Sequence, residues 1–155
     1  MARQRDVIRM SDAEIAAFLK AGQNLQVATI GADGAPHLTT VWFTVHEDRI
    51  LFETYGKSQK IVNLKRDPRL AVLAEDGTTN DSLRGVSING TAEIIEAQPR
   101  RGELMEVLIG HHFPDLAPEE LRHMAARMAE KRVVVAVVPE KVVSWDHTKL
   151  SGKGP

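Results

Sequence analysis

The segment 52–60 combines turn residues and side chains suited to binding an anion. A β-like stretch ends there, Gly56 turns the chain, and a helical pattern begins at Ser58. The first turn of a helix offers unpaired N–H groups and the positive end of its dipole. Ser58, with Lys57 and Lys60 three residues apart, would hold a phosphate there through charge-assisted hydrogen bonds. The simpler interpretation is an ordinary N-cap beside two solvated lysines.

Two further residues are candidate ligand contacts. Trp42 would either stack on a planar ring or fill the wall of a core, and Arg84 would either contact an anion or lie solvated on a strand. Among the histidines, His111 and His112 are adjacent and so point about 100° apart on a helix, and no carboxylate stands at HExxH spacing. We therefore predict no metal site. Nothing in the spacing indicates a catalytic triad or paired carboxylates, so the catalytic residues stay unknown.

Short β-like stretches joined by turns must position these residues. The alternation of Val41, Phe43 and Val45 after the Asp33-Gly34 turn predicts a hairpin. A continuous β-branched run at 133–138 predicts a strand buried on both faces, and Pro139 is expected to separate it from a last strand. The predicted strands are 25–30, 36–45, 50–52, 70–73, 86–94, 133–138 and 141–145, with Gly90 as a bulge or point of close approach.

Helical patterns occupy the remaining length. Ser11 and Glu14 form a capping box ahead of a helix that Gly22 ends. Apolar residues at helical spacing predict three more helices, at 57–66, 98–111 and 118–132. The sum is a mainly β fold: an antiparallel β-barrel with peripheral helices, in one domain over residues 1–150 and with a disordered tail at 151–155.

Composition excludes several classes of function. The 155 residues contain no cysteine, which removes disulfides, thiolate nucleophiles and cysteine-based metal sites. A formal charge of −1 gives no global field that favours nucleic acid or an anionic membrane. No apolar run approaches the ~20 residues of a membrane span, and residues 1–10 lack the apolar core of a signal peptide. A cytoplasmic protein is expected.

Most of the chain resembles the pyridoxamine 5'-phosphate oxidase-like split-barrel flavoproteins. The resemblance rests on the order and spacing of several short motifs, none specific alone: Ala28-Thr29-Ile30, Asp33-Gly34 with Pro36, Val41-Trp42-Phe43, Phe52-x-Thr54 followed by Ser58-x-Lys60, Asn63-Leu64, Asp67-Pro68-Arg69, and the stretch 86–93 around Gly90. The resemblance implies an FMN-binding type of split β-barrel. It also implies a flavin phosphate at Lys57, Ser58 and Lys60, with the ring along Thr39, Thr40, Val41 and Trp42.

The chain departs from the oxidase that gives the family its name. Leu38 and Phe43 occupy the positions of two basic residues of that enzyme, and its basic C-terminus is reduced here to the segment 145–150. Vitamin B6 chemistry is therefore not expected. The segments 63–69 and 82–86 are nearer to the branch that uses the deazaflavin coenzyme F420, which also contains FMN-dependent members. The resemblance thus implies an oxidoreductase that uses F420, or alternatively FMN, to pass a hydride to a small organic acceptor.

Two expectations follow from this resemblance and one alternative stays open. A homodimer with the cofactor between its subunits is expected, from the family and from the apolar run 133–138. F420 carries a polyglutamate tail, so Lys57, Lys60, Lys65, Arg66 and Arg84 are expected to line a basic groove. The alternative to an enzyme is a carrier or sensor that holds a flavin or haem without turning over a substrate.

Overall fold

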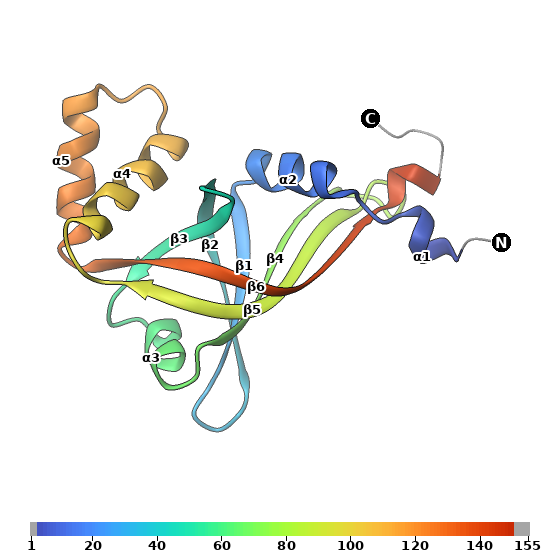
Figure 1. The fold of residues 1–155 in the computed structure, drawn as a ribbon, viewed down its shortest axis with the longest axis horizontal. Coiled ribbons are helices and arrows are strands. Elements are labelled where there is room, and N and C mark those ends of the chain that lie inside the picture. Colours follow the sequence, from blue (N-terminus) through green and yellow to red (C-terminus); the bar gives the residue numbers. More distant parts are fainter. Residues whose placement is uncertain (1–2, 151–155) are drawn as a thin grey trace.

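Six antiparallel strands close into a barrel in the computed structural model, which describes residues 3–150 (Figure 1). The strands follow one another around the barrel in the order β1-β2-β3-β6-β5-β4. The strands are β1 (Asn24–Ile30), β2 (Pro36–His46), β3 (Arg49–Tyr55), β4 (Arg69–Asp76), β5 (Arg84–Ile95) and β6 (Arg132–Asp146). The helices are α1 (Gln4–Val7), α2 (Asp12–Ala21), α3 (Gln59–Arg66), α4 (Arg100–His112), α5 (Pro118–Ala129) and the 3-10 helix η1 (His147–Leu150). The predicted mainly β barrel with peripheral helices is confirmed.

Helix α2 begins at the predicted capping box. The Ser11 hydroxyl accepts from the Glu14 N–H at 3.2 Å, and the Glu14 carboxylate accepts from the Ser11 N–H at 2.6 Å. Helices α3 and α5 lie within their predicted segments, α4 extends one residue beyond its own, to His112, and the short helices α1 and η1 were not predicted. α3 starts at Gln59, and α5 stops at Ala129 because Arg132 already pairs with Tyr55 in the sheet. None of the described helices is long and apolar enough to cross a membrane.

The predicted burial of the run 133–138 on both faces is confirmed for 133–137, whereas Val138 is 40% exposed. Val133, Val135 and Val137 point into the barrel, whereas Val134 and Ala136 pack under α4 and α5. Figure 1 shows these two helices at one end of the barrel, opposite α1 and η1. Because the chain's own helices cover the outer face of 133–137, this part of the run is not evidence for a partner subunit.

The predicted break at Pro139 is also wrong, since β6 continues from Arg132 to Asp146. β5 pairs along almost all of this length, with an irregularity where Asn89 opposes Lys141 and Gly90 opposes Pro139. Glu140 is thus an extra residue on β6, and this bulge accommodates the proline without ending the strand. The prediction for Gly90 is confirmed, because a Cβ there would lie 2.1 Å from the carbonyl oxygen of Val138.

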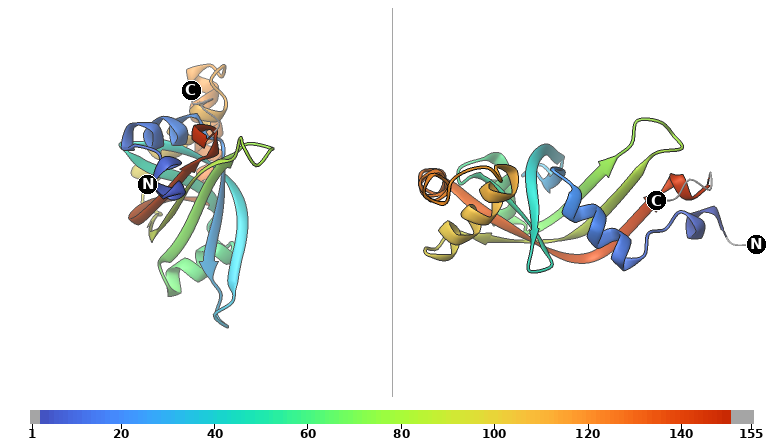
Figure 2. Two further views of the ribbon diagram at one scale, coloured as in Figure 1. Left: turned by 90° about the vertical axis from the view of Figure 1, so that its right-hand side faces the viewer. Right: turned by 90° about the horizontal axis from the view of Figure 1, so that it is seen from above.

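One half of β2 has a strand neighbour on one side only. Residues 36–42 pair with β1, while β3 pairs with β2 only from Phe43 onward. The hairpin of β1 and β2 therefore extends beyond the rest of the barrel (Figures 1 and 2). Within residues 3–150, no strand occupies the second edge of 36–42, and this open edge lies on the predicted ring-binding strand.

Candidate functional site

The predicted anion site lies where β3 ends and α3 begins. The Gly56 N–H donates to the Lys131 carbonyl at 2.9 Å, which ties the turn to the start of β6. Ser58 occupies the N-cap position in extended conformation, but its side chain makes no capping hydrogen bond. Its hydroxyl instead accepts from the Thr54 hydroxyl at 3.3 Å. The first-turn N–H groups of α3 are therefore left without a side-chain cap, so the interpretation of Ser58 as an ordinary capping residue does not hold.

Lys60 is buried rather than solvated. Its side chain is only 9% exposed, and its Nζ donates to the Thr54 hydroxyl at 3.1 Å. Since an ammonium carries three donors, this one acceptor leaves two of them unused among the described residues. Burial lowers the pKa of Lys60, the nearby Glu53 carboxylate raises it, and Arg132 lowers it further. A buried cation with spare donors at a helix start is suited to binding an anion.

A chain of two hydrogen bonds runs from Lys60 through Thr54 to Ser58, and each group donates to the next. Lys60 donates to Thr54, Thr54 donates to Ser58, and the hydroxyl hydrogen of Ser58 is left to point elsewhere. Lys57 lies next to them on the surface and forms no ion pair with any residue of 3–150. The structure thus brings Lys57, Ser58 and Lys60 together at one helix start.

Asn63 fixes α3 against the barrel. It is fully buried, its Nδ2 donates to the Thr29 hydroxyl at 3.0 Å, and its Oδ1 accepts from Gln59 at 2.9 Å. Arg66 adds a hydrogen bond to the Ile30 carbonyl. These bonds to β1 set the position of the helix start relative to the strands. Asn63 thus holds α3, and with it the anion site, against β1. Its place in the helical pattern did not indicate this role.

Alternation along β2 divides the predicted ring contacts into two groups. Thr39 and Val41 lie opposite the buried residues Val27 and Leu25 and so face the barrel interior, while Thr40 and Trp42 face outward. Near the inner face, His37 Nδ1 and Thr39 Oγ1 are buried without a hydrogen-bond partner. Buried polar atoms are nearly always paired, so these two atoms are available to hydrogen-bond a further polar group or water.

The open edge of β2 also offers backbone groups. Phe43 donates its N–H to Gln23, and Gly31 donates to Ala35, at the two ends of the β1–β2 ladder. Because hydrogen bonds alternate along an antiparallel pair, the N–H and C=O of Leu38 and Thr40 face away from β1. These backbone donors and acceptors are therefore available to a ligand that lies along the edge.

Trp42 lies apart from the helix start and packs against α4. Its indole stacks on the His112 imidazole, with ring centroids 4.7 Å apart, and Phe113 meets it edge-on at 5.9 Å. His112 and Phe113 are neighbours of the predicted site that sequence reasoning missed. The only available signal was their position at the end of an amphipathic helix, which says nothing of the strand that the helix contacts.

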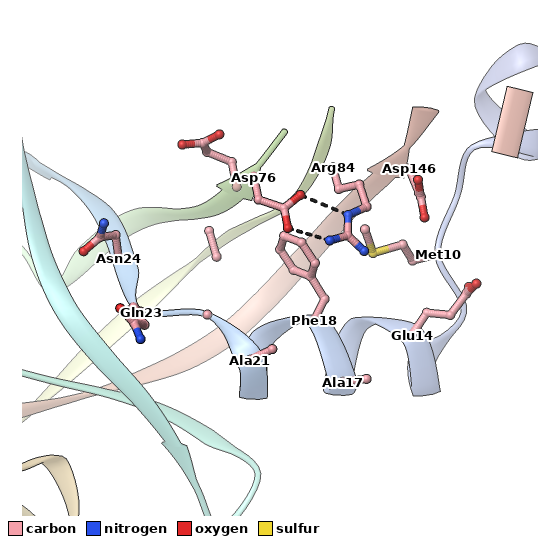
Figure 3. A pocket seen from close by; sticks show the side chains of 13 residues that line it. Met10, Glu14, Ala17, Phe18, Ala21, Gln23, Asn24, Asp76, Arg84 and Asp146 are labelled. Carbon is pink, nitrogen blue, oxygen red and sulfur yellow. Dashed lines mark hydrogen bonds and ion pairs between the residues drawn. The ribbon is translucent and has the colours of Figure 1, made fainter. Parts of the chain in front are cut away.

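Arg84 lies away from the other predicted cofactor-binding residues. It begins β5 and forms a two-pronged ion pair with Asp76, at 3.0 and 2.6 Å, above the Phe18 ring of α2 (Figure 3). It lines a cavity of about 460 Å³ between α2 and the β4–β5 end of the barrel, and no residue of α3 or its N-cap lines that cavity. Two more of the basic residues expected in the groove are also engaged: Lys65 pairs with Glu96 at 2.8 Å, and Arg66 donates to the Ile30 carbonyl.

A different basic groove adjoins the anion site. A hollow of about 350 Å³ lies between α5 and the end of β3, lined by Tyr55, Met124, Arg127, Met128, Lys131 and Arg132. Arg132 covers the Tyr55 ring at 4.1 Å and pairs with Glu53 at 2.7 Å. Arg127 and Lys131 are exposed and have no ion-pair partner within residues 3–150. Sequence reasoning missed both, because the end of α5 comes beside the end of β3 only through the Tyr55–Arg132 pairing and the Gly56–Lys131 hydrogen bond.

Comparison with known proteins gives related chains of several kinds. The family described as "Pyridoxamine 5'-phosphate oxidase" matches residues 11–146. A 5a,11a-dehydrotetracycline/5a,11a-dehydrooxytetracycline reductase of Streptomyces rimosus is 31% identical over 103 residues, covering 61% of this chain and 72% of its own. A conserved hypothetical protein of Mycobacterium tuberculosis is 44% identical, with a TM-score of 0.86 over 97% of this chain and 93% of its own. A solved F420 reductase, 22% identical, shares the fold with a TM-score of 0.63 over 81% of this chain and 93% of its own.

Proposed function

Because the chain belongs to the pyridoxamine 5'-phosphate oxidase family, we propose that it is an oxidoreductase that uses bound coenzyme F420, or alternatively FMN, to reduce a small organic acceptor. The observation that carries this proposal is the buried Lys60 ammonium at the uncapped start of α3. The reductase among its relatives and the fold shared with an F420 reductase support it.

The residues of the chain divide the work of holding such a cofactor. Lys57, Ser58 and Lys60 would bind the phosphate, and the open edge of β2 would bind the ring through the backbone of Leu38 and Thr40. His37 and Thr39 would find their missing partners there. When bound, the cofactor supplies the hydride, while the chain supplies orientation and exclusion of water.

Turnover separates the proposed enzyme from a flavin or haem carrier. Reduced cofactor bound to the protein should be reoxidised faster when an acceptor such as a quinone, enone or nitro compound is added, because an oriented acceptor reacts as if at high effective concentration. Stopped-flow absorbance measures this rate. Reoxidation that is the same with and without every acceptor, and with free cofactor, would identify a carrier instead.

Charge favours F420 over FMN in this proposal. FMN needs only the compact phosphate site, whereas F420 carries a phosphodiester and several carboxylates. The unpaired Arg127 and Lys131, in the groove at the end of β3, support a place for those carboxylates, and they replace Lys65, Arg66 and Arg84 in this role.

We expect the affinity for F420 to fall with ionic strength more steeply than the affinity for FMN. Exposed charges are screened over ~10 Å at 0.1 M salt, and F420 would make more such contacts. Fluorescence titration with both cofactors at two salt concentrations measures the difference. Arg127→Gln with Lys131→Gln should flatten the salt dependence of F420 alone, and the exposed Arg122→Gln on the same helix serves as the control. Tight FMN binding without measurable F420 binding would overturn the choice of cofactor.

We also propose a homodimer with the cofactor between the subunits. The proposed ring site lies on the open edge of β2, so a second subunit would enclose the ring. The outer faces of β1, β4 and β5 form a hollow of about 360 Å³ beside the exposed Val138 and Val142 of β6, which supports an apolar contact there. Light scattering at low micromolar concentration should give about twice 17.1 kDa. A monomer that still binds the cofactor would contradict this proposal.

A further inference from the structure

A cavity lies at the end of the barrel where β4 ends, β5 begins and β6 ends. We call it the mouth cavity, the space of about 460 Å³ between α2 and the three residues Asp76, Arg84 and Asp146 (Figure 3). Helix α2 contributes no buried residue, so it covers this end of the barrel without filling it. Neither α3 nor the open edge of β2 lines the cavity, which is therefore separate from the proposed cofactor site. Mouths of β-barrels are common places for small ligands.

Three charged residues form a row across this end of the barrel. Asp76 on β4 is paired with Arg84 on β5, which is paired with Asp146 on β6. Paired residues lie on the same face of a sheet and side chains alternate along a strand, so the row shares the face of Ala74 and Val86, which belong to the core. The row therefore ends the barrel interior with two carboxylates and one guanidinium, which together carry one net negative charge.

Arg84 is bound to only one of these two carboxylates. Its Nε and Nη2 donate to Asp76 at 3.0 and 2.6 Å, whereas Asp146 attracts it only from beyond ion-pair distance. Asp146 is nevertheless only 4% exposed. Its Oδ1 accepts from the N–H and the hydroxyl of Thr148, at 2.9 and 2.6 Å, while its Oδ2 accepts no hydrogen bond from residues 3–150. A buried carboxylate is costly unless a cation or further donors meet it, so Oδ2 is the acceptor that the cavity offers.

The remaining charges at the mouth cavity do not balance Asp146. Glu14 of α2 pairs with Lys149 at 2.8 Å, so these two cancel. Glu75 is exposed and has no ion-pair partner in the part of the chain that the structure describes. Once the two ion pairs are set aside, the uncompensated charges on the cavity wall are those of Asp146 and Glu75. Both are negative, so the field in the cavity favours a cation.

The wall formed by α2 is apolar. Phe18 and Ala21 come from the helix, and Met10 comes from the segment before it. In Figure 3 the Phe18 side chain points from the helix toward Arg84, and the guanidinium carbon lies 5.4 Å from its ring centre. Phe18 packs against the core and Met10 is only 4% exposed, so both are held in place. The mouth cavity thus joins an apolar wall to a buried carboxylate.

From this arrangement we propose that the mouth cavity binds a small organic cation, a protonated amine attached to an apolar body. The ammonium would donate to Oδ2 of Asp146, and the body would lie on Phe18 and Met10. An anion is disfavoured, because it would have to displace Asp76 from Arg84 while facing the charge of Asp146. The proposal does not rest on the proposed function, since the two sites share no residue.

Benzylamine, which is protonated at neutral pH, is the probe. Nuclear magnetic resonance titration of isotope-labelled protein without cofactor gives both the affinity and the place of binding. We expect saturable shifts of the backbone amides of Met10, Arg84 and Asp146. Benzyl alcohol has nearly the same shape without the charge and should bind about tenfold more weakly, the effect of losing a hydrogen bond between charged groups. Benzoate, with the opposite charge, should cause no shift at these amides.

Variants test the two halves of the site separately. Asp146→Asn keeps an oxygen for Thr148 and removes the charge, so it should weaken benzylamine binding about tenfold or more. Phe18→Leu keeps apolar volume but removes the ring face, and should weaken it by a smaller factor, whether or not Asp146→Asn folds. Glu140→Gln removes a carboxylate from the same strand outside the cavity and is the matched control, with the affinity of the wild type.

Three outcomes would overturn the inference. One is benzylamine affinity that is equal in the wild type, in Asp146→Asn and in Phe18→Leu. Another is binding of benzyl alcohol or benzoate as tight as that of benzylamine, which would show that charge does not select the ligand. The third is a set of shifts that never saturate or that lie away from the mouth cavity. Because the titration contains no cofactor, failure to bind F420 and FMN would contradict the proposed function without touching this result.

Discussion

Replacing Lys57 and Lys60 together by alanine should weaken cofactor binding by about 3 kcal/mol, or roughly 150-fold. Each lysine donates a charge-assisted hydrogen bond in the proposed phosphate site, and such bonds contribute about 1.5 to 3 kcal/mol each. Lys60→Ala alone should account for about half of this loss or more, because the buried ammonium is shielded from competing water. Fluorescence titration of the variants with F420 and with FMN measures the affinities.

Lys65→Ala is the matched control for this experiment. Lys65 lies on the same helix but pairs with Glu96, so its loss should leave cofactor affinity within about twofold of the wild type. Affinity that survives in the Lys57→Ala, Lys60→Ala double variant would show that the phosphate binds elsewhere.

Folding of the Lys60 variants needs a separate measurement. The simpler interpretation of the sequence was two solvated lysines at this helix start, but Lys60 is buried and its charge is incompletely compensated. Lys60→Met replaces a buried cation by an apolar side chain of similar length, which removes the desolvation cost of the ammonium and also its hydrogen bond to Thr54, so we expect the free energy of unfolding to change by no more than about 1 kcal/mol. Urea unfolding should therefore show a stable protein that has lost its cofactor affinity.

Gly90→Ala should destabilise the barrel by about 3 kcal/mol. The new Cβ would lie 2.1 Å from the Val138 carbonyl oxygen, and that atom belongs to the backbone of the paired strand. It can move only if the β5–β6 ladder shifts around the bulge at Glu140. Urea unfolding followed by circular dichroism gives the free energy of unfolding.

Gly110→Ala provides the comparison for the same chemical change. Its Cβ would meet only the tip of the Leu121 side chain at 3.4 Å, and alanine favours a helix interior over glycine by up to about 1 kcal/mol. We expect this variant to be as stable as the wild type or slightly more stable. Equal stability of Gly90→Ala and the wild type would mean that the two strands do not approach each other as closely as described.

Local signals in the sequence were enough for most of the fold. The capping box at Ser11, the alternation on β2 and the β-branched run on β6 each depend on residues that are close together in the chain. Such patterns determine which face of an element is buried, and they predicted the barrel. They failed at Pro139, because whether a proline ends a strand depends on the partner strand, and here Gly90 makes room for a bulge.

The candidate site was predictable only in part, for a related reason. Lys57, Ser58 and Lys60 lie within four residues of each other, so a helix start was bound to bring them together. Arg84 was grouped with them on charge alone, and its ion pair with Asp76 depends on the pairing of β4 with β5. The contacts of Trp42 with α4 and of Gly56 with Lys131 join segments about 70 residues apart, and no local pattern encodes such contacts.

The open edge of β2 has a consequence for handling the protein. A row of unpaired N–H and C=O groups is a template for another strand, and residues 36–42 carry no lysine or glutamate that would repel one. Leu38, 66% exposed on this strand, adds an apolar contact to any such pairing. We expect the empty protein to form aggregates at high concentration and the cofactor to act as a solubilising cap, which turbidity with and without ligand would reveal.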